Sequence, residues 1–333
     1  MPTASQAFET PPHPLAGKRM TGAEMIVQVL ADEGVDTIFG YSGGAILPTY
    51  DAVFRFNQEH DKHDPDSPIP LVVPANEQGA GFMAAGYARS TGKVGVAMVT
   101  SGPGATNTVT PVRDCMADSV PIVVICGQVP THVIGTDAFQ EAPVSAVMGS
   151  VAKHVFLVTD PTRLEATIRT AFEIARSGRP GPVVIDVPKD VQNWIGAFEG
   201  NGLLPIRAWR QRVEAVQETL LGPAEAKAFF DLLQCSLRPL LYVGGGAINS
   251  NASEALTRFA RRFRIPVATT LMGIGAFDTK DELCLRMLGM HGTAFANYAV
   301  EDCDFLIAVG ARFDDRVATD PASFAPKARR VAH

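Results

Sequence analysis

Residues 71–107 read LVVPANEQGAGFMAAGYARSTGKVGVAMVTSGPGATN, and this stretch decides the fold. An apolar run over 71–73 leads into Glu77, which begins a predicted helix built mainly from small residues. A second apolar run, over 94–100, ends in the turn Ser101-Gly102-Pro103-Gly104, whose glycines allow a backbone to approach a ligand closely. Ligands of open α/β sheets bind at such strand ends. The stretch therefore predicts a carboxylate and a glycine turn at a ligand-binding edge.

Each of these features also has a purely structural explanation. An acid in the first turn of a helix, as Glu77 would be, is stabilised by the helix dipole. A Gly-Pro-Gly sequence is common in tight turns of α/β domains. Their combination over so short a stretch favours a ligand site.

The wider sequence resembles a known family. NEQGAGFMAAGYAR, followed by GVAMVTSGPGATNTVTPVRDCMADSVPIVVICGQVP, resembles the pyrimidine-binding domain of thiamine diphosphate enzymes. The segments IGTDAFQE, RPGPVVIDVPKDVQ, LYVGGGAINS, LGMHGT and VGARFDDRV then occur in the order found in the catalytic large subunit of acetolactate synthase (acetohydroxyacid synthase). The resemblance covers residues 18–333.

The composition excludes several other classes of protein. The chain has 333 residues, 46% of them hydrophobic, which is enough for two sizeable cores. A net charge of −6 without a cluster of Lys and Arg gives no support to nucleic-acid binding. No apolar stretch approaches the roughly 18 residues that span a bilayer, so we expect no membrane association and a cytoplasmic location. The five cysteines form no C-x-x-C pair, which argues against a zinc site or a disulfide framework.

The alternation of strands and helices predicts an α/β protein with doubly wound parallel sheets. Residues 1–18 are expected to form a disordered tail, 19–195 the pyrimidine-binding domain of thiamine diphosphate, 196–222 a linker, and 223–333 an incomplete central FAD-binding domain. Thr21 and Glu24 fit a capping box at the first helix, and a helix is predicted over 104–118. Strands are predicted over 35–39, 120–126, 153–158, 182–187, 239–243, 267–271 and 305–309.

The resemblance implies roles for residues of the first domain. Glu77 would hydrogen-bond the pyrimidine ring of thiamine diphosphate and promote loss of its C2 proton, and Gln140 would face the thiazolium ring. Gly43 and Gly44, in the loop GYSGG, would lie over the cofactor. The family usually has Pro where this chain has Ser42 and His where it has Asn76, which affects positioning more than chemistry. The implied substrate channel includes Pro130, Ala138, Phe139, Lys189 and Arg316.

The resemblance also implies an FAD site. Gly244-Gly245-Gly246 lacks the third glycine of a dinucleotide fingerprint, because position 249 is Asn249. His291 has no second His or Cys at ligand spacing, so no metal site is predicted. Arg179 suits a diphosphate because its guanidinium can pair two oxygens. The residues implied in FAD binding are Arg179, Gly245, Thr270, Leu271, Met290, His291, Gly292, Thr293, Arg312, Asp314 and Asp315.

The implied reaction is decarboxylation of pyruvate and transfer of the hydroxyethyl unit to pyruvate or 2-oxobutyrate. The implied cofactors are thiamine diphosphate, FAD and Mg²⁺, with the metal ligands in a C-terminal diphosphate-binding domain that this sequence lacks. We therefore expect a truncated or split subunit that is inactive alone, in a family that forms homodimers or homotetramers and can bind a regulatory small subunit. Two alternatives remain: another thiamine diphosphate oxidase, carboligase or decarboxylase, or a non-catalytic FAD-binding remnant. The segments AFQE, VPKDV and RFDDR favour acetolactate synthase.

Overall fold

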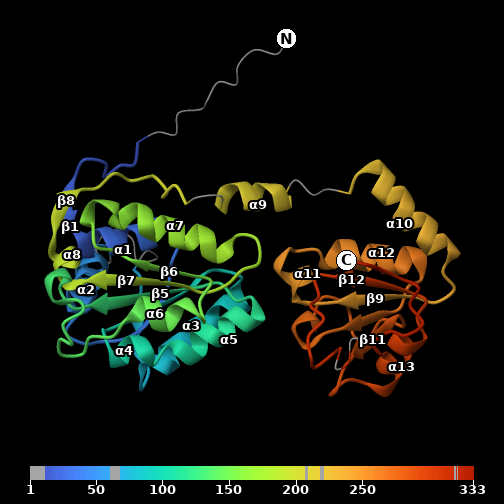
Figure 1. Ribbon diagram of the computed structural model, residues 1–333. Coiled ribbons are helices and arrows are strands. Elements are labelled where there is room, and N and C mark those ends of the chain that lie inside the picture. Colours follow the sequence, from blue (N-terminus) through green and yellow to red (C-terminus); the bar gives the residue numbers. More distant parts are fainter. Residues whose placement is uncertain (1–11, 61–67, 207–208, 218–220, 319, 321) are drawn as a thin grey trace, which may run out of the picture. The chain divides into compact units, whose positions relative to one another are not determined.

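The computed structural model describes residues 12–60, 68–206, 209–217, 221–318, 320 and 322–333. The chain divides into two compact units, residues 1–217 and 218–333, which we call the N-terminal and C-terminal units (Figure 1). No helix within the described ranges is both long enough and apolar enough to cross a bilayer.

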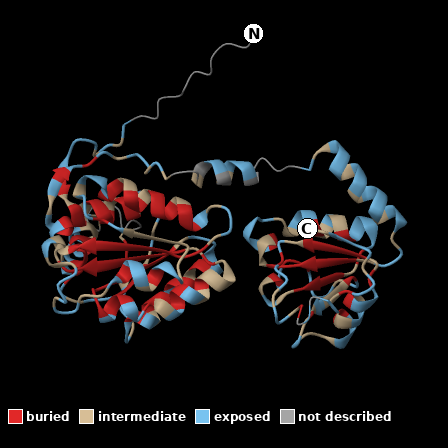
Figure 2. Ribbon diagram, in the orientation of Figure 1, coloured by how far each residue is buried: buried red, intermediate tan, exposed pale blue. Residues whose placement is uncertain are grey.

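The N-terminal unit is built on a six-stranded sheet of order β3-β2-β4-β5-β7-β6, in which every neighbouring pair is parallel. Buried side chains pack on both of its faces, so the strands themselves lie in the interior (Figure 2). The strands are β2 (Ile38–Tyr41), β3 (Leu71–Val72), β4 (Gly95–Val99), β5 (Ile122–Gln128), β6 (His154–Leu157) and β7 (Val183–Pro188).

Helices cover the two faces of this sheet (Figure 1). One core is shared with α1 (Gly22–Asp32), α2 (Leu47–His60), α7 (Leu164–Arg176) and α8 (Lys189–Asn193). The opposite core is shared with α3 (Glu77–Thr91), α4 (Pro103–Thr106), α5 (Val109–Asp118) and α6 (Val144–Gly149). The 3₁₀ turns η1 (Thr131–Val133) and η2 (Pro161–Arg163) complete the unit. The predicted doubly wound α/β fold is confirmed.

Local chemistry explains two of the helix ends. The predicted capping box is present: the backbone N–H of Thr21 donates to Oε2 of Glu24 over 2.7 Å, and the N–H of Glu24 donates to Oγ1 of Thr21 over 3.1 Å. The single helix predicted over 104–118 is wrong, because the structure has two helices, α4 and α5. Pro111 has no N–H to donate to the preceding turn, so it is accommodated near the start of a new helix.

The C-terminal unit has a five-stranded, wholly parallel sheet of order β11-β10-β9-β12-β13, again with a core on each face. The predicted strands over 239–243 and 305–309 match β9 and β12 in both bounds. Its elements are α10 (Pro223–Cys235), β9 (Pro239–Val243), α11 (Gly245–Asn249), α12 (Ser253–Phe263), β10 (Val267–Thr269), η3 (Leu271–Gly273), β11 (Cys284–Met287), α13 (Ala294–Asp302), β12 (Phe305–Val309) and β13 (Arg330–Ala332).

The segments at the limits of the predicted first domain are more structured than expected. Residues 1–11 of the predicted tail lie outside the described residues, but the N–H of Gly17 donates to the carbonyl of Phe198 over 2.8 Å. Next to it, β1 (Arg19–Thr21) pairs antiparallel with β8 (Ile195–Ala197). The N–H groups of Glu199 and Gly200 donate to the Glu165 carboxylate over 2.8 and 2.7 Å. The first part of the predicted linker is therefore bonded to the N-terminal unit, and α9 (Trp209–Gln217) forms within the rest.

Each sheet reverses its winding direction beside its first strand, and the N-terminal sheet does so again where the chain returns from β6 to β7. From β2 the chain moves outward to β3 and then returns past β2 to β4, so the loops that follow β2 and β4 diverge. In the C-terminal unit the same reversal falls between β9 and β12. Such switch points leave a crevice at the carboxyl ends of the strands, where ligands of this fold class bind.

Candidate functional site

Glu77 lies beside the switch point of the N-terminal unit, as the first residue of α3. The helix begins there because Oδ1 of Asn76 accepts a 2.8 Å hydrogen bond from the N–H of Gly79. The side chain of Glu77 is 8% exposed, so it is buried but not sealed from a ligand. A carboxylate at a helix N-terminus is favoured by the helix dipole, which supports the structural explanation of this residue as well.

Two side chains from other helical segments, Asn107 at the end of α4 and Tyr50 in α2, interact with the Glu77 carboxylate. Nδ2 of Asn107 donates to Oε2 of Glu77 over 2.9 Å, and within the described residues this is the hydrogen bond that the carboxylate receives. The Tyr50 hydroxyl, which donates to the carbonyl of Met98 over 3.0 Å, has its pKa raised by burial and by the charge of Glu77. One oxygen of the carboxylate is thus held in place by Asn107.

Glycines from two loops lie near this carboxylate. A Cβ at Gly104 would lie 2.7 Å from Cγ2 of Thr100 and 3.5 Å from Oε1 of Glu77. A Cβ at Gly43 would lie 2.5 Å from the same Thr100 methyl, whereas a Cβ at Gly44 would meet nothing within 4 Å. Oγ1 of Thr100 accepts the N–H of Ala45 over 3.3 Å, which joins the two glycine loops. The structure therefore brings Gly43, Gly44 and Glu77 to one edge of the sheet.

The loop that carries Gln140 lies over the glycine turn. Gly102 has a φ of +53°, and a Cβ on it would lie 2.4 Å from the carbonyl oxygen of Gln140. Gln140 itself has a φ of +56° and is exposed. Its neighbour Glu141 braces the loop, because its carboxylate accepts hydrogen bonds from the N–H groups of Gly135 and Ala138. These backbone N–H groups lower the pKa of Glu141. The sequence did not predict this role of Glu141, because a single acidic residue in an exposed loop belongs to no recognisable sequence pattern.

Four of the five predicted substrate-channel residues belong to the N-terminal unit. Lys189 begins α8, and Pro130 follows β5; Asp190 joins the two segments by accepting the N–H of Thr131 over 3.0 Å. Phe139 is 88% exposed and follows Ala138 in the Gln140 loop. Arg316 belongs to the C-terminal unit, where its Nε lies 3.7 Å from Oδ2 of Asp315.

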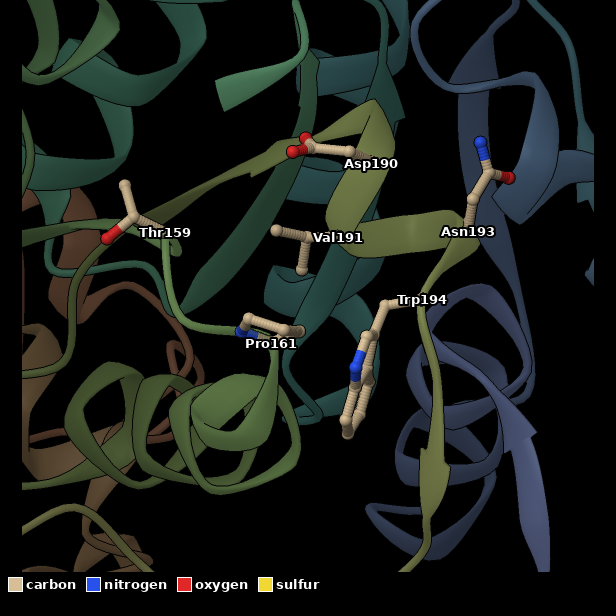
Figure 3. A pocket seen from close by; sticks show the side chains of 6 residues that line it. All are labelled: Thr159, Pro161, Asp190, Val191, Asn193 and Trp194. Atoms are coloured by element: carbon tan, nitrogen blue, oxygen red, sulfur yellow. The ribbon is translucent and has the colours of Figure 1, made fainter. Parts of the chain in front are cut away.

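A surface pocket adjoins α8 (Figure 3). The Trp194 ring lies along one side of it, and the Asp190 carboxylate is held by Thr131. None of the residues predicted from the sequence lines this pocket, which is formed by Thr159, Pro161, Asp190, Val191, Asn193 and Trp194.

In the C-terminal unit, the residues predicted to contact FAD follow the carboxyl ends of four neighbouring strands. Gly245 follows β9, Thr270 and Leu271 follow β10, and the other two groups come after β11 and β12. Because parallel strands end at the same edge, all these residues gather there. The group after β11 is Met290, His291, Gly292 and Thr293, and the group after β12 is Arg312, Asp314 and Asp315.

The glycine run at this edge has a structural role. A Cβ on Gly244 would lie 2.3 Å from the carbonyl oxygen of Gly310, and one on Gly246 would lie 2.7 Å from Cα of Gly310. Gly310 itself has a φ of +56°. The glycines therefore allow the loops after β9 and β12 to touch. This structural role does not require the third glycine that the dinucleotide fingerprint lacks.

Side chains at this edge differ in how far they are exposed and in whether they already make polar contacts within the protein. Leu271 and Met290 are 68% and 56% exposed. The hydroxyls of Thr270 and Thr293 cap η3 and α13, by accepting the N–H groups of Gly273 and Ala296 over 3.0 and 3.2 Å. Arg312 pairs with Asp314 over 3.2 Å. Across the described parts of both units, no group of three or more His, Cys, Asp and Glu side chains is arranged to hold a metal.

Arg179 is held by hydrogen bonds at the end of α5. Its guanidinium caps the end of α5, donating over 2.9 Å to the carbonyls of Met116 and Ala117 and over 2.8 Å to Oγ of Ser119. This residue belongs to the N-terminal unit, and its contact with FAD stays a prediction.

Two domain families match the chain. Residues 20–147 match the thiamine pyrophosphate enzyme N-terminal TPP binding domain, and residues 226–333 match the thiamine pyrophosphate enzyme central domain. The acetolactate synthase large subunit of Parasynechococcus marenigrum is 50% identical over 95% of this chain and 49% of its own length. The mitochondrial acetolactate synthase catalytic subunit of Saccharomyces cerevisiae is 48% identical over 94% of this chain and 44% of its own.

The acetolactate synthase of Arthrospira platensis is 46% identical over 95% of this chain and 53% of its own length. The chain thus spans about half the length of the curated relatives it matches. The two domain matches and these relatives show that the chain belongs to the thiamine pyrophosphate enzyme family and is similar, within it, to acetolactate synthase catalytic subunits.

Proposed function

We propose that this chain supplies the pyrimidine-binding and central parts of an acetolactate synthase. The reaction would decarboxylate pyruvate and transfer the hydroxyethyl unit to pyruvate or 2-oxobutyrate, the first common step of branched-chain amino acid biosynthesis. The observation that carries the proposal is the placement of Glu77, a buried carboxylate at the switch point of the sheet, held by Asn107 and bordered by glycines. The names of the similar proteins support the same activity.

Glu77 fits the part that a thiamine diphosphate site needs. Asn107 fixes Oε2, while Oε1 lies 3.5 Å from where a Cβ at Gly104 would stand, beside the methyl group of Thr100. A carboxylate so placed would accept a hydrogen bond from a ring nitrogen and share its proton. Bound thiamine diphosphate would supply the electron sink for decarboxylation.

The surrounding loops would shape the rest of the site. The open space over Gly44 would admit the cofactor, and Gln140 would approach it from the loop above Gly102. Lys189 and Pro130 lie on segments that Asp190 joins, which supports a common channel wall. Phe139, exposed on the same loop as Gln140, would form the apolar part of that wall.

We propose further that the C-terminal unit binds FAD at the edge formed by β9, β10, β11 and β12. Exposed Leu271 and Met290 would cover the flavin ring, and the Arg312–Asp314 pair would bind its polar groups. Mg²⁺ would be held with the cofactor diphosphate by residues outside this sequence. The proposal includes assembly as a homodimer or homotetramer, binding of a regulatory small subunit, and a cytoplasmic location.

A reconstitution experiment tests the function. The chain would be mixed with the C-terminal half of the Arthrospira relative, thiamine diphosphate, Mg²⁺, FAD and pyruvate, and acetolactate would be measured. We expect acetolactate in the mixture and none from either part alone. A folded complex that binds thiamine diphosphate but forms no acetolactate, or forms product only from glyoxylate, would contradict the proposal.

A further inference from the structure

A buried polar pair lies beneath the site, at the carboxyl ends of β5 and β7. Asp186 and Gln128 are 1% and 2% exposed. Nε2 of Gln128 donates to Oδ2 of Asp186 over 3.0 Å and to the carbonyl oxygen of Ala142 over 3.1 Å. Its Oε1 accepts the N–H of Val129 over 2.8 Å. Both N–H groups and the oxygen of this amide are therefore occupied, which fixes its orientation.

The pair connects the interior of the sheet to the loop above the glycine turn. Ala142 lies just beyond Gln140, and the Glu141 brace lies between them. The carbonyl of Gln140 lies over Gly102. A displacement of Ala142 would therefore move the whole turn that presents Gln140.

A carboxyl side chain such as Asp186 lowers the stability of the fold when it is buried in a core, which argues for a specific role. It occupies the face of β7 that packs with Val184 in an otherwise apolar core. Within the described residues its Oδ1 has no hydrogen-bond partner, and a buried polar atom without a partner destabilises a fold. An apolar side chain would pack there at lower cost, but it would leave the Gln128 amide without one of its acceptors.

We propose that Asp186 is a positioning residue, which through Gln128 sets the place of the Gln140 loop over the thiamine diphosphate site. The link to thiamine diphosphate rests on the proposed function, whereas the link to the loop rests on the contacts alone. The mechanism is mechanical: the carboxyl holds the amide, and the amide holds the carbonyl of Ala142.

The protonation state of Asp186 is a second property of this arrangement that can be measured. Burial raises the pKa of this carboxyl to about 7, against the smaller lowering effect of the hydrogen bond from Gln128. The titratable group that faces Asp186 from the neighbouring strand β5 is the Cys126 thiol. Burial and the charge of Asp186 raise the pKa of this thiol well above its usual value. On the other side β6 presents Leu157, and α6 contributes the apolar Val144 and Met148.

Hydrogen exchange of the loop amides tests the positioning role in the full chain. We expect Asp186→Leu to speed exchange over residues 133–142 by about tenfold, and Asp186→Asn, which keeps an acceptor oxygen, to restore protection. Val184→Ala is the matched control, because it weakens the same face of the same strand without touching Gln128. Equal loop protection in all four proteins, or equal loss in Asp186→Leu and Val184→Ala, would overturn the inference.

Thiamine diphosphate binding, measured by calorimetry with Mg²⁺ in the reconstituted mixture, separates the two proposals. If the unmodified chain binds the cofactor, Asp186→Leu should weaken binding by about tenfold and Asp186→Asn by much less. Unchanged affinity in Asp186→Leu despite a loosened loop would overturn the link to the cofactor. If the reconstituted mixture with the unmodified chain does not bind the cofactor at all, the proposed function fails, and the exchange result still decides whether Asp186 positions the loop.

Discussion

The side-chain amide of Asn107 donates a 2.9 Å hydrogen bond to Oε2 of Glu77. The two residues come from different strand-to-helix crossings, one after β3 and one after β4, and meet at the switch point of the sheet. Asn107 cannot take a proton from the carboxylate, so it orients Glu77 without competing for the proton that Glu77 would share. Asn107 was not among the residues predicted for the site.

Replacing Asn107 by Ala should therefore weaken the site while the fold persists. Without the amide, the carboxylate can rotate away from its position beside Gly104, and we expect thiamine diphosphate affinity to fall about tenfold. Calorimetric titration of the reconstituted mixture with thiamine diphosphate measures this effect. Asn193→Ala, an exposed amide-to-methyl change on α8, is the control. Equal affinities for the two variants would show that Asn107 does not orient Glu77.

Gly104→Ala should destabilise the N-terminal unit because the new Cβ would lie 2.7 Å from the methyl of Thr100. Overpacking of this kind costs about 1–3 kcal/mol. Adding Thr100→Ser removes that methyl but keeps the hydroxyl that accepts the N–H of Ala45, so the double variant should recover most of the loss. Urea unfolding of the two single variants and the double variant measures the coupling. Strictly additive losses would argue against a methyl clash.

Asp186 should make stability depend on pH. Its ordinary pKa of 3.8 rises to about 7 on folding, so between those values the folded state keeps a proton that the unfolded state releases. The free energy of unfolding should therefore fall as pH rises, by about 2 kcal/mol between about pH 5.5 and pH 8. Asp186→Asn should lack this slope and gain stability relative to the unmodified chain at the higher pH. Parallel pH profiles of the two proteins would contradict the assignment.

Arg179→Ala separates a structural from a ligand-binding role. The structure shows the guanidinium at the end of α5, and loss of its hydrogen bonds to two carbonyls should lower the unfolding free energy by about 1–3 kcal/mol without any flavin. Unfolding with and without FAD measures both effects. A stability loss that is the same in both conditions, with unchanged FAD affinity, would exclude the flavin contact.

Much of the fold follows from the sequence because its strands are buried on both faces. Such strands appear as continuous apolar runs, and for this reason β9 and β12 were predicted in both bounds. Glu77 and the turn at Gly102 were found because a strand-to-helix change marks them. A local pattern, however, carries no trace of partners that meet only in the folded chain.

Several of the features that were missed are of this long-range kind. Gln128 meets Asp186 across a strand pair, and Glu165 binds the N–H groups of the segment predicted as a linker. Arg179 reaches the end of α5 from a distant turn. The roles assigned to the FAD and substrate-channel residues stay predictions.

The most direct test of the central claim is turnover and cofactor binding in Glu77→Gln, assayed in the reconstituted mixture beside the unmodified chain. Glutamine keeps the shape of the side chain and can still accept from Asn107, but it cannot take a proton. We expect acetolactate formation to fall at least about a hundredfold, the contribution typical of a proton-transferring group, with unfolding unchanged to within about 1 kcal/mol. Turnover equal to that of the unmodified chain would contradict the account.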